Sequence, residues 1–129
     1  MFTIDQIKAA HSKVKSGADF PQYIQEIKAL GVTGYETHVL DGHVVYHGAD
    51  NFTTQAPAKY DPLPIAPTPN IPEFKAGLLA HQQGKTDYLT FIKMCAECGV
   101  EKWVVSMGEM TCTYFDKEGG EVLVERVAG

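Results

Sequence analysis

An internal repeat constrains the fold of this sequence more strongly than any other feature. Residues 19–50 align with residues 87–118 at an offset of 68 residues, and five of the 32 aligned pairs are identical. Aromatic residues also align with aromatic residues at positions expected to be buried, as Tyr35 does with Trp103. Two copies are too few for a solenoid, which needs about three repeats or more. We therefore predict one domain built from two related halves.

Each half is predicted to fold as two helices followed by a β-meander. A capping box formed by Thr3 and Gln6 predicts a helix that ends near Gly17. Apolar residues at helical spacing then predict a second helix from about Asp19 to Gly31. The corresponding helices of the second half are expected to start at Asn70 and Asp87 and to end at Gly84 and Gly99. Alternating hydrophobicity predicts strands at 33–39, 43–48, about 52–55, 101–107, 111–116 and 121–127.

The predicted fold class is α+β, an internal duplication of two helix-helix-β-meander repeats. Its antiparallel strands form one sheet or two apposed sheets covered by helices. Repeat 1 spans about 3–55, a proline-rich crossover about 56–72 and repeat 2 about 70–127, all within a single domain, 1–129. The crossover holds six of the seven prolines, so it is expected to be extended. It is either a strap between the halves or an arm offered to a partner.

Composition and charge exclude several classes of function. The chain is 44% hydrophobic and 21% charged, which is typical of a globular protein with a buried core. Its net charge of −5, with 11 scattered basic residues, disfavours binding to a nucleic-acid backbone. No apolar run approaches the roughly 18 residues of a membrane span, and the first residues do not resemble a signal peptide. We therefore expect a cytoplasmic protein that contacts neither nucleic acid nor membrane.

The cysteines include a CxxC motif, Cys95 and Cys98, which can be a redox pair or half of a zinc site. Both residues are expected in the last turn of a helix, where the helix dipole disfavours a thiolate. In the repeat alignment, these two cysteines and Cys112 replace aliphatic residues of the first half. We therefore predict three buried, unreactive thiols and no cofactor, and a redox or metal role is the alternative.

One face of the first predicted hairpin gathers titratable side chains. The expected turn at Asp41-Gly42 has two residues, and strand alternation then places four side chains on one face: Glu36, His38, His43 and His47. In this register Glu36 lies opposite His47. Two imidazoles and a carboxylate could hold a divalent metal or act as a general base, so Glu36, His38 and His47 are the metal-site candidates. The alternative is a solvated or interface-facing sheet surface.

The opposite face of the predicted sheet is expected to pack against the helices. It carries Tyr35, Thr37, Val39, Val44 and Tyr46 in the first half, and Trp103, Val105, Met107, Cys112 and Tyr114 in the second. Large aromatic residues dominate cores, so a core is predicted and an aromatic-lined pocket is the alternative. His11 and His81 lie on apolar helix faces and are expected to be hydrogen-bonded core residues. No nucleophile, base and orienting residue can be assembled from known motifs.

Four stretches of the sequence carry a resemblance to known proteins: residues 84–91 (GKTDYLTF), 99–105 (GVEKWVV), 110–116 (MTCTYFD) and 122–125 (VLVE). The chain resembles a family of small bacterial and prophage proteins of unknown function, whose members are often labelled phage envelope protein. The resemblance covers essentially the whole chain and is densest from His81 to Asp116. It implies a bacterial or prophage origin and assigns no active-site residues.

These observations favour a non-enzymatic binding or protein-interaction module, whose partner is another protein or a second copy of the chain. The alternative is a small-molecule enzyme or metal-binding protein that uses Glu36, His38 and His47 or the cleft between the repeats. A structural phage component is the third hypothesis. Convergence of the three candidate side chains around one point would favour a metal or catalysis, whereas a dispersed set would favour the binding module.

Overall fold

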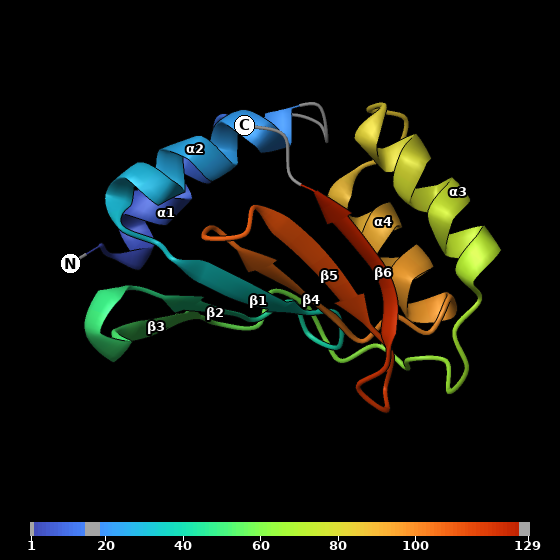
Figure 1. Cartoon of the computed structure of the whole chain (residues 1–129). Helices are drawn as coiled ribbons and strands as arrows, with labels where there is room; N and C mark the ends of the chain where they lie inside the picture. Colours follow the sequence, from blue (N-terminus) through green and yellow to red (C-terminus); the bar gives the residue numbers. More distant parts are fainter. Residues whose placement is uncertain (1, 15–18, 127–129) are drawn as a thin grey trace.

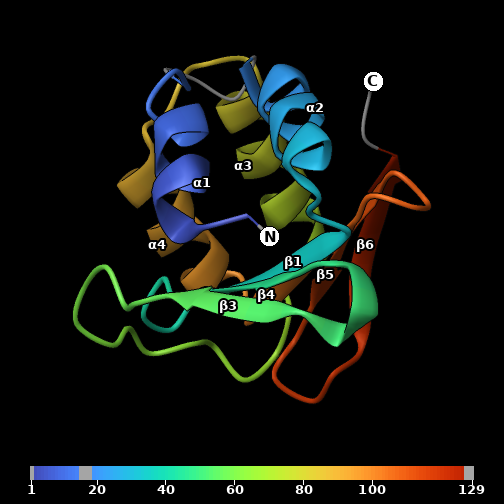
Figure 2. The ribbon, with the colours of Figure 1, turned by 90° about the vertical axis from the view of Figure 1, so that its left-hand side faces the viewer.

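The computed structural model describes residues 2–14 and 19–126, and it shows an antiparallel sheet with helices on one face (Figure 1, Figure 2). The α+β fold class is therefore confirmed, with one six-stranded sheet rather than two apposed sheets. Within the described ranges, no helix is long and apolar enough to cross a membrane.

The helices begin where the capping residues predict. The helices are α1 (Ile4–His11), α2 (Phe20–Leu30), α3 (Ile71–Gln82) and α4 (Tyr88–Glu97), with a short 3-10 helix, η2, at Ala49–Asn51. Thr3 and Gln6 form the predicted capping box, because the Thr3 N–H donates to Gln6 Oε1 over 2.8 Å and the Gln6 N–H donates to Thr3 Oγ1 over 3.2 Å. The Thr90 N–H donates to Asp87 Oδ1 over 2.8 Å at the start of α4. The predicted end of the first helix at Gly17 lies outside the described residues.

The strands form one continuous sheet in which the two meanders meet at its centre. The strands are β1 (Gly34–His38), β2 (Val44–His47), β3 (Thr53–Ala56), β4 (Lys102–Ser106), β5 (Thr111–Phe115) and β6 (Glu121–Arg126), in the sheet order β3-β2-β1-β4-β5-β6. The central pair is β1 and β4, where Glu36 lies opposite Val104. Both halves have the same order of elements along the chain. The duplication inferred from the sequence alignment stays a prediction.

The predicted turn at Asp41-Gly42 is wrong, because the hairpin between β1 and β2 has a longer loop. Thr37 lies opposite Val44, and the His38 N–H donates to the His43 carbonyl, so residues 39–42 form a four-residue loop. The loop receives two backbone hydrogen bonds from the proline-rich segment, one from the Lys59 N–H to the Asp41 carbonyl at 2.8 Å. The register therefore differs from the prediction by two residues, which keeps every side chain on its predicted face.

The proline-rich segment between β3 and α3 runs without helix or strand over residues 57–70. Burial raises the pKa of Tyr60 to about 12, so its hydroxyl stays protonated and donates to the Val39 carbonyl over 2.6 Å. Further along, the Asn70 N–H donates to the Cys98 carbonyl at the end of α4. These bonds hold the segment against the loop after β1 and against α4 of its own chain. The repeat boundaries stay a prediction, and so does the alternative that the segment is an arm offered to a partner.

The predicted inner face of the sheet is buried beneath the helices. Tyr35 and Tyr46 from the first half and Trp103 and Tyr114 from the second are all at most 8% exposed. The three cysteines are free and buried, which confirms the prediction made from the repeat alignment. Burial raises the pKa of each thiol above its ordinary value, so all three stay protonated near neutral pH.

Candidate functional site

A cleft of about 510 Å³ opens between the helices and the inner face of the sheet. Helices α1 and α2 form one pair and α3 and α4 the other, and both pairs stand on the same side of the sheet (Figure 1, Figure 2). All four helices and five of the strands contribute lining residues. Eight aromatic side chains line the cleft: Phe20, Tyr23, Tyr35, Tyr46, Tyr88, Phe91, Trp103 and Tyr114. The aromatic-lined pocket, which was the alternative to a closed core, is therefore present.

The floor of the cleft contains three buried side chains with polar atoms. Tyr35 is 5% exposed, Thr37 3% and Trp103 8%. Thr37 and Trp103 lie directly opposite each other on β1 and β4, and Tyr35 is on the same face of β1. Among the described residues, the Tyr35 hydroxyl, the Thr37 hydroxyl and the Trp103 indole N–H have no hydrogen-bond partner. In the same residues, every side-chain nitrogen or oxygen that is fully shielded from solvent does have a partner. These three polar atoms therefore keep some solvent-accessible surface, and all three residues line the cleft.

The tyrosines of the cleft are neutral hydrogen-bonding groups. Burial raises the pKa of Tyr35 and Tyr88 well above the ordinary value of a phenol. The pKa of Tyr23 is raised by burial and by the neighbouring Tyr46 hydroxyl, to which it is hydrogen-bonded. At neutral pH all of these hydroxyls keep their proton and can donate it in a hydrogen bond.

Basic groups lie at one rim of the cleft. Lys59 is exposed, and its Nζ lies 5.9 Å from the centre of the Tyr88 ring. Desolvation lowers the pKa of Lys59, and the positive charge of the nearby Lys8 lowers it further. His11 was expected in the core but is exposed, because α1 ends at this residue and its ring packs edge-on to Tyr23 at 5.3 Å. Desolvation and the nearby Lys59 lower the pKa of His11.

His81 lies at the rim formed by α3 and α4. Its ring is half-buried and stacks on Phe91 with ring centres 4.3 Å apart, and its Nδ1 lies 3.0 Å from Thr86 Oγ1. The expected hydrogen bond is therefore present, although the ring borders the cleft. Desolvation is the largest influence on His81 and lowers its pKa. On the same rim, the Gln82 side chain donates to Glu125 Oε1 over 3.0 Å and links α3 to β6.

The outer face of the sheet brings together two of the three metal-site candidates. His38 Nε2 lies 3.3 Å from Glu36 Oε2, and the His38 ring stacks on His43 with ring centres 4.2 Å apart. His47 lies opposite Gly34 instead of Glu36, because of the four-residue loop. Across residues 2–14 and 19–126, no three His, Cys, Asp or Glu side chains gather in a geometry that could hold a metal. Metal binding by Glu36, His38 and His47 stays a prediction.

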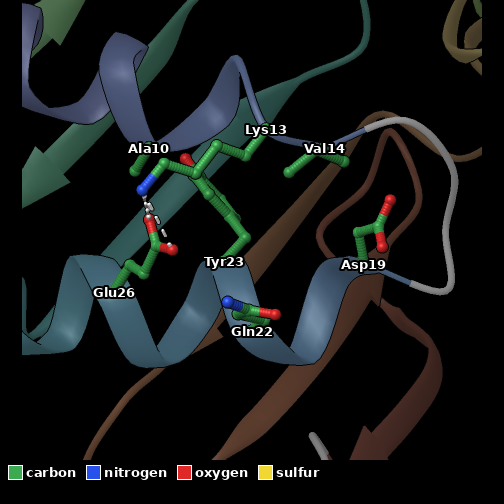
Figure 3. Close-up of a pocket in the computed structure, with 7 residues that line it drawn as sticks. All are labelled: Ala10, Lys13, Val14, Asp19, Gln22, Tyr23 and Glu26. Atoms are coloured by element: carbon green, nitrogen blue, oxygen red, sulfur yellow. Dashed lines mark hydrogen bonds and ion pairs between the residues drawn. The ribbon is translucent and has the colours of Figure 1, made fainter.

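A smaller pocket lies between α1 and α2 (Figure 3). Its volume is about 60 Å³, and the Lys13 and Glu26 side chains form an ion pair at 3.4 Å across it. Ligand sites usually measure about 300–1,000 Å³, so this pocket has room for a few water molecules only. The larger cleft is the candidate functional site.

The internal repeat contains a signal that could have identified some of the cleft residues from the sequence. Phe20 aligns with Tyr88 and Tyr23 aligns with Phe91, and all four side chains line the cleft. Lys59 had no such signal, since it lies in the proline-rich segment and reaches the cleft only through the path of that segment.

The fold and the cleft define a small α+β protein with an aromatic-lined cleft between its helix pairs and its sheet. Residues 8–126 match the family described as Protein of unknown function (DUF1398), and the chain belongs to this family. This match confirms the resemblance to a family of unknown function. No curated protein matches the chain significantly.

Proposed function

We propose that this protein is a non-enzymatic binding module that takes a small organic molecule into the cleft. The observation that carries the proposal is a cleft of about 510 Å³ with aromatic walls, into which three buried polar side chains open. Small-molecule sites are typically concave, mostly apolar and supplied with a few placed polar groups. Tyr35, Thr37 and Trp103 supply such groups here.

Binding is favoured over chemistry by the protonation states of the cleft. Burial raises the pKa of the Cys112 thiol to about 12, so the thiolate that a nucleophile needs is scarce at neutral pH. The tyrosines are neutral for the same reason. These groups suit the donation of hydrogen bonds to a ligand better than attack on a substrate.

A thermal-shift screen against a library of metabolites tests the proposal, with protein treated beforehand with a chelator. A ligand at about 100 times its Kd adds about 2.7 kcal/mol to the free energy of unfolding, which raises Tm by roughly 10 °C for a chain of this size. The chain has one tryptophan, Trp103, so each hit is then titrated by its effect on tryptophan fluorescence. A library that leaves Tm unchanged, or hits that leave the Trp103 signal unchanged, would refute a ligand site in the cleft.

Metal binding on the outer sheet face is the second candidate function. The contact of 3.3 Å between Glu36 Oε2 and His38 Nε2 is the observation in its favour. If zinc or nickel binds there, it should raise the Tm of the wild type, and His38→Ala and His47→Ala should lose that increase while the metal-free Tm stays nearly constant. An equal increase in the variants would exclude this site.

We also propose that the protein associates with a second copy of itself, that it is cytoplasmic and that it is of bacterial or prophage origin. Among the described residues, no helix covers the outer sheet face, and its side chains, such as Val45 and Val104, are half-buried. A second copy of the chain on this face would give a dimer mass in sedimentation equilibrium. A monomer mass at all concentrations would exclude self-association and leave another protein as the macromolecular partner.

A further inference from the structure

We infer that the cleft selects a planar aromatic molecule bearing a carboxylate or a similar oxygen anion. This inference rests on the proposed binding function and specifies the chemistry of its ligand. Three features of the cleft carry it: the hydrogen-bond donors of the floor, the aromatic walls and the charge at the rim.

The floor of the cleft offers hydrogen-bond donors to a ligand. The Trp103 indole N–H can only donate a hydrogen bond, and the neutral Tyr35 hydroxyl has no acceptor among the described residues. Thr37 and Trp103 face each other across β1 and β4, so their side chains begin about 5 Å apart. Tyr35 is two residues along β1, roughly 7 Å away on the same face. The three residues are therefore neighbours on the floor of the cleft, and one ligand with oxygen acceptors can contact all three.

The aromatic side chains that line the cleft suit a flat ring. The Phe91 and Trp103 rings have centres 5.7 Å apart, and the Trp103 and Tyr114 rings 6.1 Å apart, both in tilted orientations. On the other side, the Tyr35 and Tyr46 rings are tilted with centres 5.6 Å apart. Rings at these spacings present faces and edges to a guest, and an aromatic guest packs against them by offset stacking and edge contacts.

The charge at the rim favours an anion. Lys59 borders the cleft and forms no salt bridge with any described residue. Two carboxylates also line the cleft, and each is held by a neighbour: Asp87 accepts from the Thr90 N–H and Glu125 accepts from the Gln82 side chain. A ligand anion therefore meets, at Lys59, a cation that no described carboxylate pairs with.

Three probes with the same ring test the ligand chemistry by isothermal titration calorimetry: 2-naphthoate, 2-naphthylmethanol and 2-naphthylmethylammonium. We expect 2-naphthoate to bind the wild type at least about tenfold more tightly than the alcohol, with the ammonium probe weakest. The Trp103 indole N–H resonance, unique in this chain, should move downfield with 2-naphthoate because it gains an acceptor.

Matched variants assign the preference to the named groups. Thr37→Val should raise the Kd of 2-naphthoate by about tenfold, and Lys59→Met should raise it severalfold without changing the Kd of the alcohol. Thr113→Val, on the outer face of the same sheet, and Lys117→Met, in the turn before β6, make the same chemical changes away from the cleft. Both controls should bind 2-naphthoate as the wild type does.

Two results would overturn the inference and are distinguishable from failure of the proposed function. Equal or tighter binding of the alcohol or ammonium probe would show that the cleft binds rings without selecting an anion, and the proposed function would stand. Failure of all three probes to bind would also overturn the inferred ligand class. The proposed function fails as well only if the metabolite library leaves Tm unchanged or its hits leave the Trp103 fluorescence unchanged.

Discussion

Replacing Thr37 with valine tests the polar floor of the cleft directly. The substitution keeps the shape of the side chain and exchanges its hydroxyl for a methyl group. Thr37 is 3% exposed, and its hydroxyl has no hydrogen-bond partner among the described residues. Because no sealed side-chain polar atom among the described residues lacks a partner, this hydroxyl keeps some contact with the cleft while most of the residue is buried.

The expected effect of Thr37→Val on stability is an increase. A hydroxyl transferred from water without a partner costs about 1–3 kcal/mol by mutational data, and a buried methyl group contributes about 0.8 kcal/mol. The hydroxyl still touches the cleft, so part of the cost is relieved by water. We expect the free energy of unfolding to rise by about 1 kcal/mol, which raises Tm by about 4 °C for 129 residues.

Urea denaturation, followed by circular dichroism, measures this change, and the m-value shows whether both proteins unfold alike. Thr113→Val is the matched control, because Thr113 pairs with Val104 on the outer face, and its effect should stay within about 0.5 kcal/mol. A Thr37→Val protein that is less stable than the wild type by 1 kcal/mol or more would show that the hydroxyl makes a stabilising bond. That result would refute the argument for an open donor on the floor.

The remaining predictions concern the proline-rich segment, the thiols and pH. Gly99→Ala should destabilise the protein by at least about 1 kcal/mol more than Gly119→Ala. Both glycines have a φ near +80°, but only a Cβ at Gly99 would lie 2.7 Å from the Thr68 carbonyl oxygen. Equal losses of stability in urea denaturation would contradict that contact. The three cysteines should react with a thiol reagent at the rate of unfolding, and rapid labelling of the native protein would contradict their burial. Burial lowers the pKa of His81, so the unfolded chain binds its proton first as the pH falls below about 6.5, and stability should decrease from there down to the lower folded pKa. His81→Gln should weaken this decrease between pH 7.5 and 5, and an unchanged pH profile would exclude His81 as its source.

Local sequence signals predicted the elements of the fold well. The capping box of Thr3 and Gln6 and the side-chain cap of Asp87 act within one helical turn, so they can be identified from neighbouring residues. Strand alternation also placed each inner and outer side chain correctly. The placement was correct even where the predicted register of the hairpin was wrong, because a shift by two residues leaves each side chain on the same face of the sheet.

The metal-site prediction was the part most sensitive to register. Its candidates depended on Glu36 lying opposite His47, and the longer loop places His47 opposite Gly34 instead. Residues 59–63 of the proline-rich segment hold this loop through backbone hydrogen bonds. A contact between residues about 20 positions apart leaves no periodic pattern in the sequence, so the turn residues alone favoured the shorter hairpin.

Hydrophobic periodicity was sufficient for the element types, the buried face of the sheet and the burial of the cysteines, because each follows from the spacing of side chains along one element. The cleft depended on the tertiary structure. Whether Tyr35 and Trp103 close a core or line a cavity is decided by where two pairs of helices, distant in the chain, come to rest above the sheet. Lys59 reaches the rim only because the proline-rich segment crosses there. Periodicity reports which residues are withdrawn from water, whereas packing between distant elements decides which of their polar atoms are left open for a ligand.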